Sequence, residues 1–113
     1  MQGELLKLYM SQTIEHQGKP LYEWLLEEAQ HLGIPGGSAL RAIAGFGRHG
    51  RLHEEFFFEI AGDLPVLIEF FAEAKAIEQL LQRLQEENIA VFYTRLAAQG
   101  GLTGNSKQAS SPG

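Results

Sequence analysis

The residues best suited to chemistry are gathered in one short glycine-rich segment, GFGRHGRLH, which runs from residue 45 to residue 53. Gly45 and Gly47 would let backbone N–H groups come close to an anion, because glycine has no side chain to block the approach. Arg48 adds a planar fork of donors that matches two phosphate oxygens. Charge-assisted hydrogen bonds contribute roughly 1.5 to 3 kcal/mol each, so three or four could give micromolar affinity, which needs ~8 kcal/mol. The segment therefore predicts a site for a small anion, foremost a nucleotide.

Positive charge is concentrated around this segment, although the chain of 113 residues is acidic overall, with a formal net charge of −5. Arg41, Arg48 and Arg51 are three of its five arginines, and no carboxylate lies between Arg41 and Glu54. An acidic chain attracts nucleic acid and anionic membranes poorly, because both favour basic surfaces. We therefore expect no nucleic-acid partner and no insertion into a membrane. Arg41 would also contribute to the anion site if its side chain reaches the cleft in which the anion binds.

Two histidines in the same segment raise a second possibility. His49 and His53 are four residues apart, a spacing that on a helix directs both side chains at one metal ion. A glycine-rich loop does not guarantee that geometry, so a small oligomer that binds divalent metal is the alternative interpretation. A third interpretation is an assembly module without a ligand, whose loop arginines are solvated or paired with the carboxylates of Glu54, Glu55 or Glu59.

Catalytic groups are harder to find, and we expect no enzymatic activity. The adjacent pairs at 27–28 and 86–87 are glutamates in predicted helices, where neighbouring side chains diverge around the axis instead of converging on a substrate. We interpret them as solvated faces. No serine has a recognisable arrangement with a histidine and a carboxylate. The isolated His16 and His31 are interpreted as surface or capping residues.

Apolar periodicity predicts the elements that must position the glycine-rich segment. Helical spacing indicates helices within 19–37, ended by Gly33, and over 73–87, the second without a good N-cap residue. Alternating or β-rich runs indicate strands at 4–11, 38–47 and 89–96, and a hairpin within 55–72. With the extra hairpin strand set aside, the order is βαββαβ. This is the split βαβ pattern of the ferredoxin-like α+β fold, an antiparallel sheet with two helices on one face.

The chain length fits one domain, which we expect to span 1–98, followed by a disordered tail at 99–113 that is rich in small and polar residues. No apolar run approaches the ~20 residues that a membrane-spanning helix needs. The N-terminus MQGELLKLYM lacks the features of a secretory signal. The chain has no cysteine, which excludes disulfides and thiolate metal sites. We expect a cytoplasmic protein.

The predicted strands carry large apolar groups on both faces. In 66–71, for example, Val66, Ile68 and Phe70 alternate with Leu67 and Phe71. Two helices cover one face only, and an antiparallel sheet exposed to water on the other would show polar residues at every second position there. We therefore expect an obligate homo-oligomer in which the open sheet faces pack together. The alternative is that the tail or the hairpin covers this face within one chain.

Several motifs together resemble a known family. GKPLYE, LRAIAGFG, a histidine shortly afterwards and DLPVLIE span residues 18–69, and they resemble the domain of unknown function 190 family, which is PII-like. AGFGRHG followed by EIAGDLPVLIEFF also resembles the PII signal-transduction proteins themselves, where a similar glycine-rich run leads into a long mobile loop. The resemblance implies a ferredoxin-like homotrimer with three clefts between subunits.

PII proteins bind adenine nucleotides in those clefts, so the resemblance implies the same ligand class here. Gly45, Gly47 and Arg48 match motif residues that line the cleft, whereas His49 stands where the motif has a glutamine. PII proteins also wrap the phosphates with a second glycine-rich loop before their second helix, but EFFAEAKAIEQ at 69–79 has no glycine. Any nucleotide site must therefore be shallower or built differently.

PII proteins pass the state of this site to a partner through the loop, and the partner is often a membrane transporter. The resemblance therefore implies that effector binding orders residues 46–54 and changes the surface offered to a target, with a transporter as the implied class. The CutA group, another trimeric relative, is associated with divalent metals, and this supports the metal-binding alternative at His49 and His53.

Overall fold

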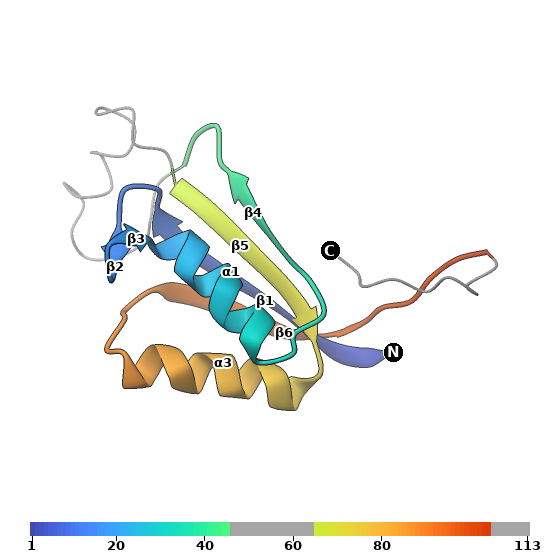
Figure 1. The fold of residues 1–113 in the computed structure, drawn as a ribbon. Coiled ribbons are helices and arrows are strands. Elements are labelled where there is room, and N and C mark those ends of the chain that lie inside the picture. The colour runs from blue at the N-terminus through green and yellow to red at the C-terminus, as the bar shows by residue number, and fades with distance from the viewer. Residues whose placement is uncertain (46–64, 105–113) are drawn as a thin grey trace.

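The computed structural model describes residues 1–45 and 65–104. In these residues a four-stranded antiparallel sheet carries both helices on one face (Figure 1). The strand order across the sheet is β4-β5-β1-β6, which is the order of a ferredoxin-like fold. The elements are β1 (Gln2–Ser11), β2 (Glu15–His16), β3 (Lys19–Pro20), α1 (Leu21–His31), β4 (Gly37–Arg41), β5 (Pro65–Ala72), α3 (Ala74–Glu86) and β6 (Phe92–Gln99).

The core lies between the helices and one face of the sheet. Leu6 and Leu8 of β1 are fully buried, as is Ile68 of β5. Leu21, Trp24, Leu25 and Ala29 of α1, and Ile77, Leu80 and Leu84 of α3, are buried against this face. The predicted alternation in the first strand and the helical periodicity of both helices are therefore confirmed.

Both helices end in the same way. In α1, Gly33 adopts a φ of +83° and its N–H bonds to the carbonyl of Gln30, while the N–H of Ile34 bonds to that of Ala29. In α3, Asn88 has a φ of +58°, and the N–H of Ile89 bonds to the carbonyl of Leu84. These are Schellman closures, which satisfy the last carbonyls and bring an apolar residue back onto the helix.

The helix starts differ from the ends, since neither has a side-chain cap. For α3 this agrees with the expectation from the sequence. In α1 the N–H of Leu21 instead bonds to the carbonyl of Ile14 at 2.8 Å. The short β2–β3 pair that holds Ile14 in place was not predicted, because a pairing of two residues leaves no periodic signal.

Two predicted strands differ clearly in their bounds from the structure, whereas the first differs only in that β1 begins at Gln2 instead of residue 4. The predicted strand at 38–47 stops at Arg41, and the next residue, Ala42, still donates its N–H to the carbonyl of Pro65 at 2.9 Å. The predicted strand at 89–96 begins only at Phe92, because Ile89 belongs to the closure of α3, and it continues to Gln99. The first strand of the predicted hairpin, and residues 105–113, lie outside the described residues.

One close contact fixes how β4 meets its neighbour. Gly37 pairs with Phe70, and a Cβ on Gly37 would lie 2.4 Å from the Phe70 ring. No side chain fits in that space, so glycine here lets the edge strand approach β5 while the Phe70 ring stays in the core.

Candidate functional site

The structure brings together the two ends of the chain segment that contains the predicted anion site. The chain leaves β4 after Arg41 and enters β5 at Pro65, and Arg41 pairs with Val66 across these strands. Gly45 lies beside the start of β5, since a Cβ at this position would be 3.7 Å from Cγ of Pro65. The remaining predicted ligands, Gly47, Arg48 and His49, lie outside the described residues, as does His53.

Arg41 is exposed at the end of the edge strand. Its Nε donates a hydrogen bond of 2.8 Å to Oε1 of Gln12, in the turn after β1. No carboxylate in residues 1–45 or 65–104 pairs with its guanidinium, which makes it different from Arg83 and Arg95. A guanidinium held by a neutral amide keeps its charge available for an external anion. This is the feature that the predicted anion site requires of Arg41.

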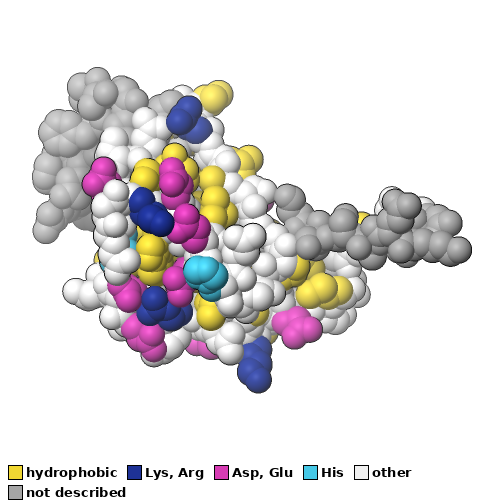
Figure 2. Space-filling model, in the orientation of Figure 1, with side chains coloured by type: hydrophobic (Ala, Val, Ile, Leu, Met, Phe, Trp, Pro, Cys, Tyr) yellow, Lys and Arg dark blue, Asp and Glu magenta, His cyan; other side chains and the backbone are white. Residues whose placement is uncertain are grey.

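The other described arginines are neutralised within the fold. Nε of Arg95 donates to Glu4, and its Nη1 lies 2.7 Å from Oε1 of Glu78. These hydrogen bonds, first that to Glu78, raise the pKa of Arg95 above its usual value. On the helix-bearing side of the molecule, most basic side chains likewise lie next to acidic ones and form no large patch of one sign (Figure 2).

A second cluster joins three elements near the end of α3. Arg83 donates 2.8 Å from Nε to Oε2 of Glu28 on α1, and its Nη1 reaches Glu86 at 3.2 Å and Glu87 at 3.3 Å. Nε2 of His16 lies 3.0 Å from Oε1 of Glu87. The hydrogen bond to Glu28 is the main reason why the pKa of Arg83 is raised, and the bond with His16 is the main reason why that of Glu87 is lowered.

This cluster corrects two interpretations made from the sequence. Glu28 and Glu87 are not solvated helix faces, because both are committed to Arg83. His16 is not a surface histidine, since its ring is half-buried and packs edge-on against Trp24 with 4.8 Å between ring centroids. The cluster holds α1, α3 and β2 together, so we assign it a structural role.

The face of the sheet without helices carries rows of aligned side chains. Leu40, Leu67, Tyr9 and Phe92 form one row across all four strands. The Tyr9 and Phe92 rings in that row are tilted at 42°, with centroids 5.6 Å apart. Phe71, Leu5 and Leu96 form another row. Leu40 is 47% exposed and Leu96 is 50% exposed, so the predicted apolar surface is present and uncovered by the described residues.

Between these two apolar rows lies a polar one, which was not predicted from the sequence. It consists of Ser38, Glu69, Lys7 and Thr94. Nζ of Lys7 is 4.0 Å from Oε2 of Glu69. The open face is therefore two apolar bands separated by a band that contains an ion pair, and not one continuous apolar surface.

The described residues contain no group of three or more histidine, aspartate or glutamate side chains that could hold a metal ion. The predicted metal ligands His49 and His53 are outside those residues and stay a prediction. No helix among the described residues is long and apolar enough to cross a membrane.

Comparison with known proteins identifies the family. The model of the domain of unknown function 190 (DUF190) family, described as "Uncharacterized ACR", matches residues 3–95. The chain belongs to the DUF190 family. A UPF0166 protein of Aquifex aeolicus is 33% identical over 82 residues, which cover 73% of this chain and 78% of that protein. A UPF0166 protein of Methanocaldococcus jannaschii is 27% identical over 86 residues, covering 76% and 79%.

The fold of this DUF190 chain is also found in a solved structure. A crystal structure from Thermus thermophilus, described as that of a PII-like signaling protein, superposes with a TM-score of 0.57 at 21% sequence identity. The match covers 86% of this chain and 87% of the other. This likeness confirms the PII-like α+β fold that the motifs predicted.

Proposed function

We propose that the chain is a non-catalytic, PII-like regulatory protein of the cytoplasm that binds a small anionic effector, foremost an adenine nucleotide. The proposed ligands are Gly45, Gly47, Arg48, His49 and Arg41. The observation that carries the proposal is the state of Arg41. Its guanidinium is exposed, bound to a neutral amide and free of any described carboxylate, at the point where the chain leaves the sheet.

The sequence around Arg41 supports an anion more than any other ligand. The next carboxylate along the chain is Glu54, and the intervening residues add Arg48 and Arg51. In a chain with a net charge of −5, such a local excess of positive charge attracts anions to one place while the rest of the surface repels them. Glycines in the same stretch would allow backbone N–H groups to add to the binding.

We further propose that the protein is a homotrimer, assembled through the open sheet face, and that the effector sites lie between subunits. Full burial of a large apolar side chain contributes ~1.5 to 3 kcal/mol. Because these side chains are already at least about half-buried in one chain, burial of the remaining surface of four of them would contribute on the order of 3 to 6 kcal/mol, a large share of the stability of a small domain. In a free subunit these side chains would stay in contact with water, and this stabilisation would be absent.

In this proposal the effector acts by ordering residues 46–54, which changes the surface that a target protein meets. In the sequence, residues 46–54 belong to the connection between β4, which ends at Arg41, and β5, which begins at Pro65. A membrane transporter is the proposed class of target, by analogy with PII proteins.

The decisive experiment is calorimetric titration of the full-length protein with adenine nucleotides, cyclic nucleotides and inorganic phosphate, in wild type and in Arg48→Ala. Binding to wild type with at least tenfold weaker affinity in the variant is expected, since one charge-assisted bond contributes roughly 1.5 to 3 kcal/mol. Lys75→Ala is the matched control, because it removes an exposed cation on α3. Absence of any binding, or equal binding by all three proteins, would refute the proposed site. Recovery of the nucleotide unchanged is expected from a non-catalytic protein.

A further inference from the structure

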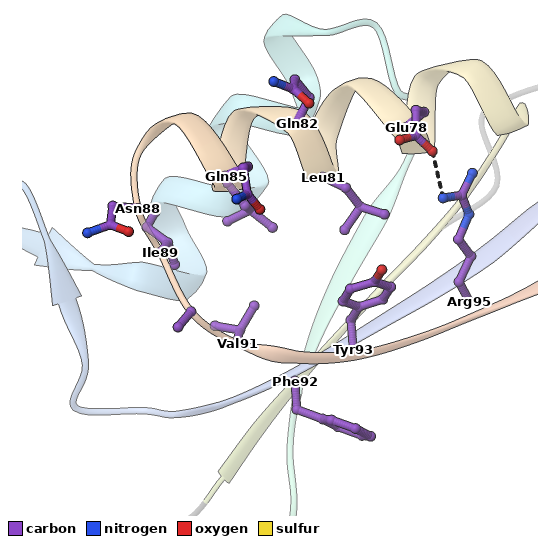
Figure 3. A pocket seen from close by; sticks show the side chains of 12 residues that line it. Glu78, Leu81, Gln82, Gln85, Asn88, Ile89, Val91, Phe92, Tyr93 and Arg95 are labelled. Atoms are coloured by element: carbon purple, nitrogen blue, oxygen red, sulfur yellow. Dashed lines mark hydrogen bonds and ion pairs between the residues drawn. The ribbon is translucent and has the colours of Figure 1, made fainter.

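A groove lies on the helix side of β6, at the opposite edge of the sheet from Arg41. Tyr93 belongs to the helix-facing side of the sheet, because its partner across β1 is Leu8, which is fully buried. Tyr93 is nevertheless 44% exposed. Helix α3 does not lie close over this strand, and the space between them has a volume of about 830 Å³ (Figure 3).

The surface of the groove is apolar inside and amide-rich at its helix rim. Figure 3 shows Leu81 of α3 and Tyr93 of β6 pointing toward one another across the gap, with Val91 beside them. The amides of Gln82, Gln85 and Asn88 also line the groove. They can both donate and accept hydrogen bonds without carrying charge.

Charge in the groove is balanced. The charged lining residues are Glu78 and Arg95, and they pair with each other at 2.7 Å. Arg95 also binds Glu4. Because this guanidinium is already shared by two carboxylates, an anionic ligand would have to displace them. A cationic ligand would in turn compete with Arg95 for Glu78, so the groove suits an uncharged occupant.

The backbone of β6 offers a second kind of binding. This strand pairs with β1 on one side and is the last strand of the sheet, so over residues 93–99 its other side presents backbone N–H and C=O groups that no described strand uses. Such an edge is a template for another extended chain. Successive side chains of that chain would point alternately to the two faces of the sheet.

We propose that an uncharged, extended segment of a partner protein binds here as an additional strand along β6. Every second side chain of the segment is apolar and enters the groove against Leu81, Val91 and Tyr93, while its backbone pairs with β6. Neither the edge nor the groove alone would define the ligand. Together they fit strand addition, in which backbone bonds give affinity and alternate pockets give selectivity.

This surface is separate from the proposed effector site and shares no residue with it. A small neutral molecule could fill the groove but would not pair with the edge backbone of residues 93–99, which no described strand uses. A second copy of the chain is the other conceivable occupant, and the sedimentation of a groove variant distinguishes it.

The test is selection of short random displayed peptides against the full-length protein, followed by titration with the selected peptides made synthetically. Peptides with apolar residues at alternate positions, and no charge at those positions, are expected. Tyr93→Ser should weaken their binding about tenfold or more, because aromatic anchors dominate such interfaces. The control Leu102→Ser removes a side chain of similar exposure, 52%, outside the groove, and should bind as wild type. Circular dichroism checks that both variants are folded.

Two further readouts separate strand addition from simple filling of the groove. N-methylation of those alternate backbone amides that face β6 should abolish binding, whereas methylation of the other alternate set should not. Hydrogen exchange of the β6 amides should slow when the peptide binds. Peptides without alternation, equal binding to Tyr93→Ser, or unchanged β6 exchange would overturn the proposal. So would a Tyr93→Ser protein that sediments as a smaller species than wild type, since a second copy would then occupy the groove. Arg48→Ala should leave peptide binding unchanged. A failure of the proposed effector site can therefore be told apart from a failure of the proposed peptide site.

Discussion

Nε2 of His16 and Oε1 of Glu87 lie 3.0 Å apart, although 71 residues separate them in the sequence. The contact joins the short β2–β3 pair, which precedes α1, to the residue that ends α3. Glu87 also receives a hydrogen bond from Arg83, which in turn binds Glu28 of α1. Glu87 therefore connects β2 to α3 directly, and to α1 through Arg83.

Replacement of Glu87 should make the fold less stable near neutral pH and change its response to acid. The pKa of Glu87 is lowered below its usual 4.5, first by the hydrogen bond with His16. Because this pKa is lower in the folded state, the stability that ionised Glu87 contributes is fully present above about pH 4.5. It is lost as pH falls through the folded-state pKa. Urea unfolding of wild type and Glu87→Gln across pH 3 to 7 should show a gap in stability that closes on acidification.

The matched control for this experiment is Glu86→Gln. Glu86 also contacts Arg83, but it is 53% exposed and does not touch His16, so its removal should have a smaller effect, as for other exposed ion pairs. Equal effects of the two substitutions at all pH values would contradict the proposed importance of the His16 contact.

Gly37 should be intolerant of any side chain. Because a Cβ here would lie 2.4 Å from the Phe70 ring, Gly37→Ala should displace that ring or the edge strand and reduce the free energy of unfolding by about 1 to 3 kcal/mol. Denaturant unfolding measures this directly. Gly101→Ala is the control, because nothing lies within 4 Å of a Cβ at that position; a loss of stability there as large as that of Gly37→Ala would show that the Phe70 contact is not the cause.

Charged side chains on the open sheet face should separate the subunits. Leu40 and Leu96 are exposed in the described chain, so Leu40→Glu with Leu96→Glu should leave each subunit folded while carboxylates oppose burial in an interface. Sedimentation velocity at low micromolar concentration should show a shift from oligomer to monomer. Ile14→Glu, at a side chain that is 45% exposed in the turn after β1, should leave the oligomer intact. If wild type is already a stable monomer, the proposed assembly is wrong.

Arg41 should contribute to effector affinity less directly than Arg48. Arg41→Ala removes one guanidinium from the edge of the sheet and should weaken nucleotide binding by about tenfold, the effect of one charge-assisted bond. Gln12→Leu removes the amide that holds Nε of Arg41 at 2.8 Å but leaves the charge, so it should have a smaller effect. Calorimetry at two salt concentrations would check the result, since both differences should shrink as salt rises.

Local patterns in the sequence were sufficient for most of the fold. Leu6, Leu8 and Met10 alternate with Leu5, Lys7 and Tyr9, and the first set is the buried one. The spacing of apolar residues located both helices, because burial on one side of a helix imposes that spacing. The motifs then identified the family, which the match over residues 3–95 confirms.

What the sequence could not supply was contact between distant residues and the precise ends of strands. Ala42, Ile43 and Ala44 continue the alternation of β4, yet the strand stops at Arg41, since alternation does not reveal whether a neighbouring strand is present. The binding of Glu87 to His16, and the exposure of Tyr93 beside α3, depend on how separate elements pack. Of the predicted effector ligands, only Gly45 and Arg41 lie in the described residues, and the effector site stays a prediction.

The ion pair of Lys7 and Glu69 lies between the two apolar rows on the open face of the sheet. If a second copy packed on this surface one row out of alignment, its apolar side chains would cover both charges. Each charge would then be desolvated without gaining a polar partner. Correct alignment avoids that penalty by matching polar groups with polar groups. In the proposed assembly the pair would therefore act as a positional key, which adds little to the strength of association but discourages misaligned arrangements.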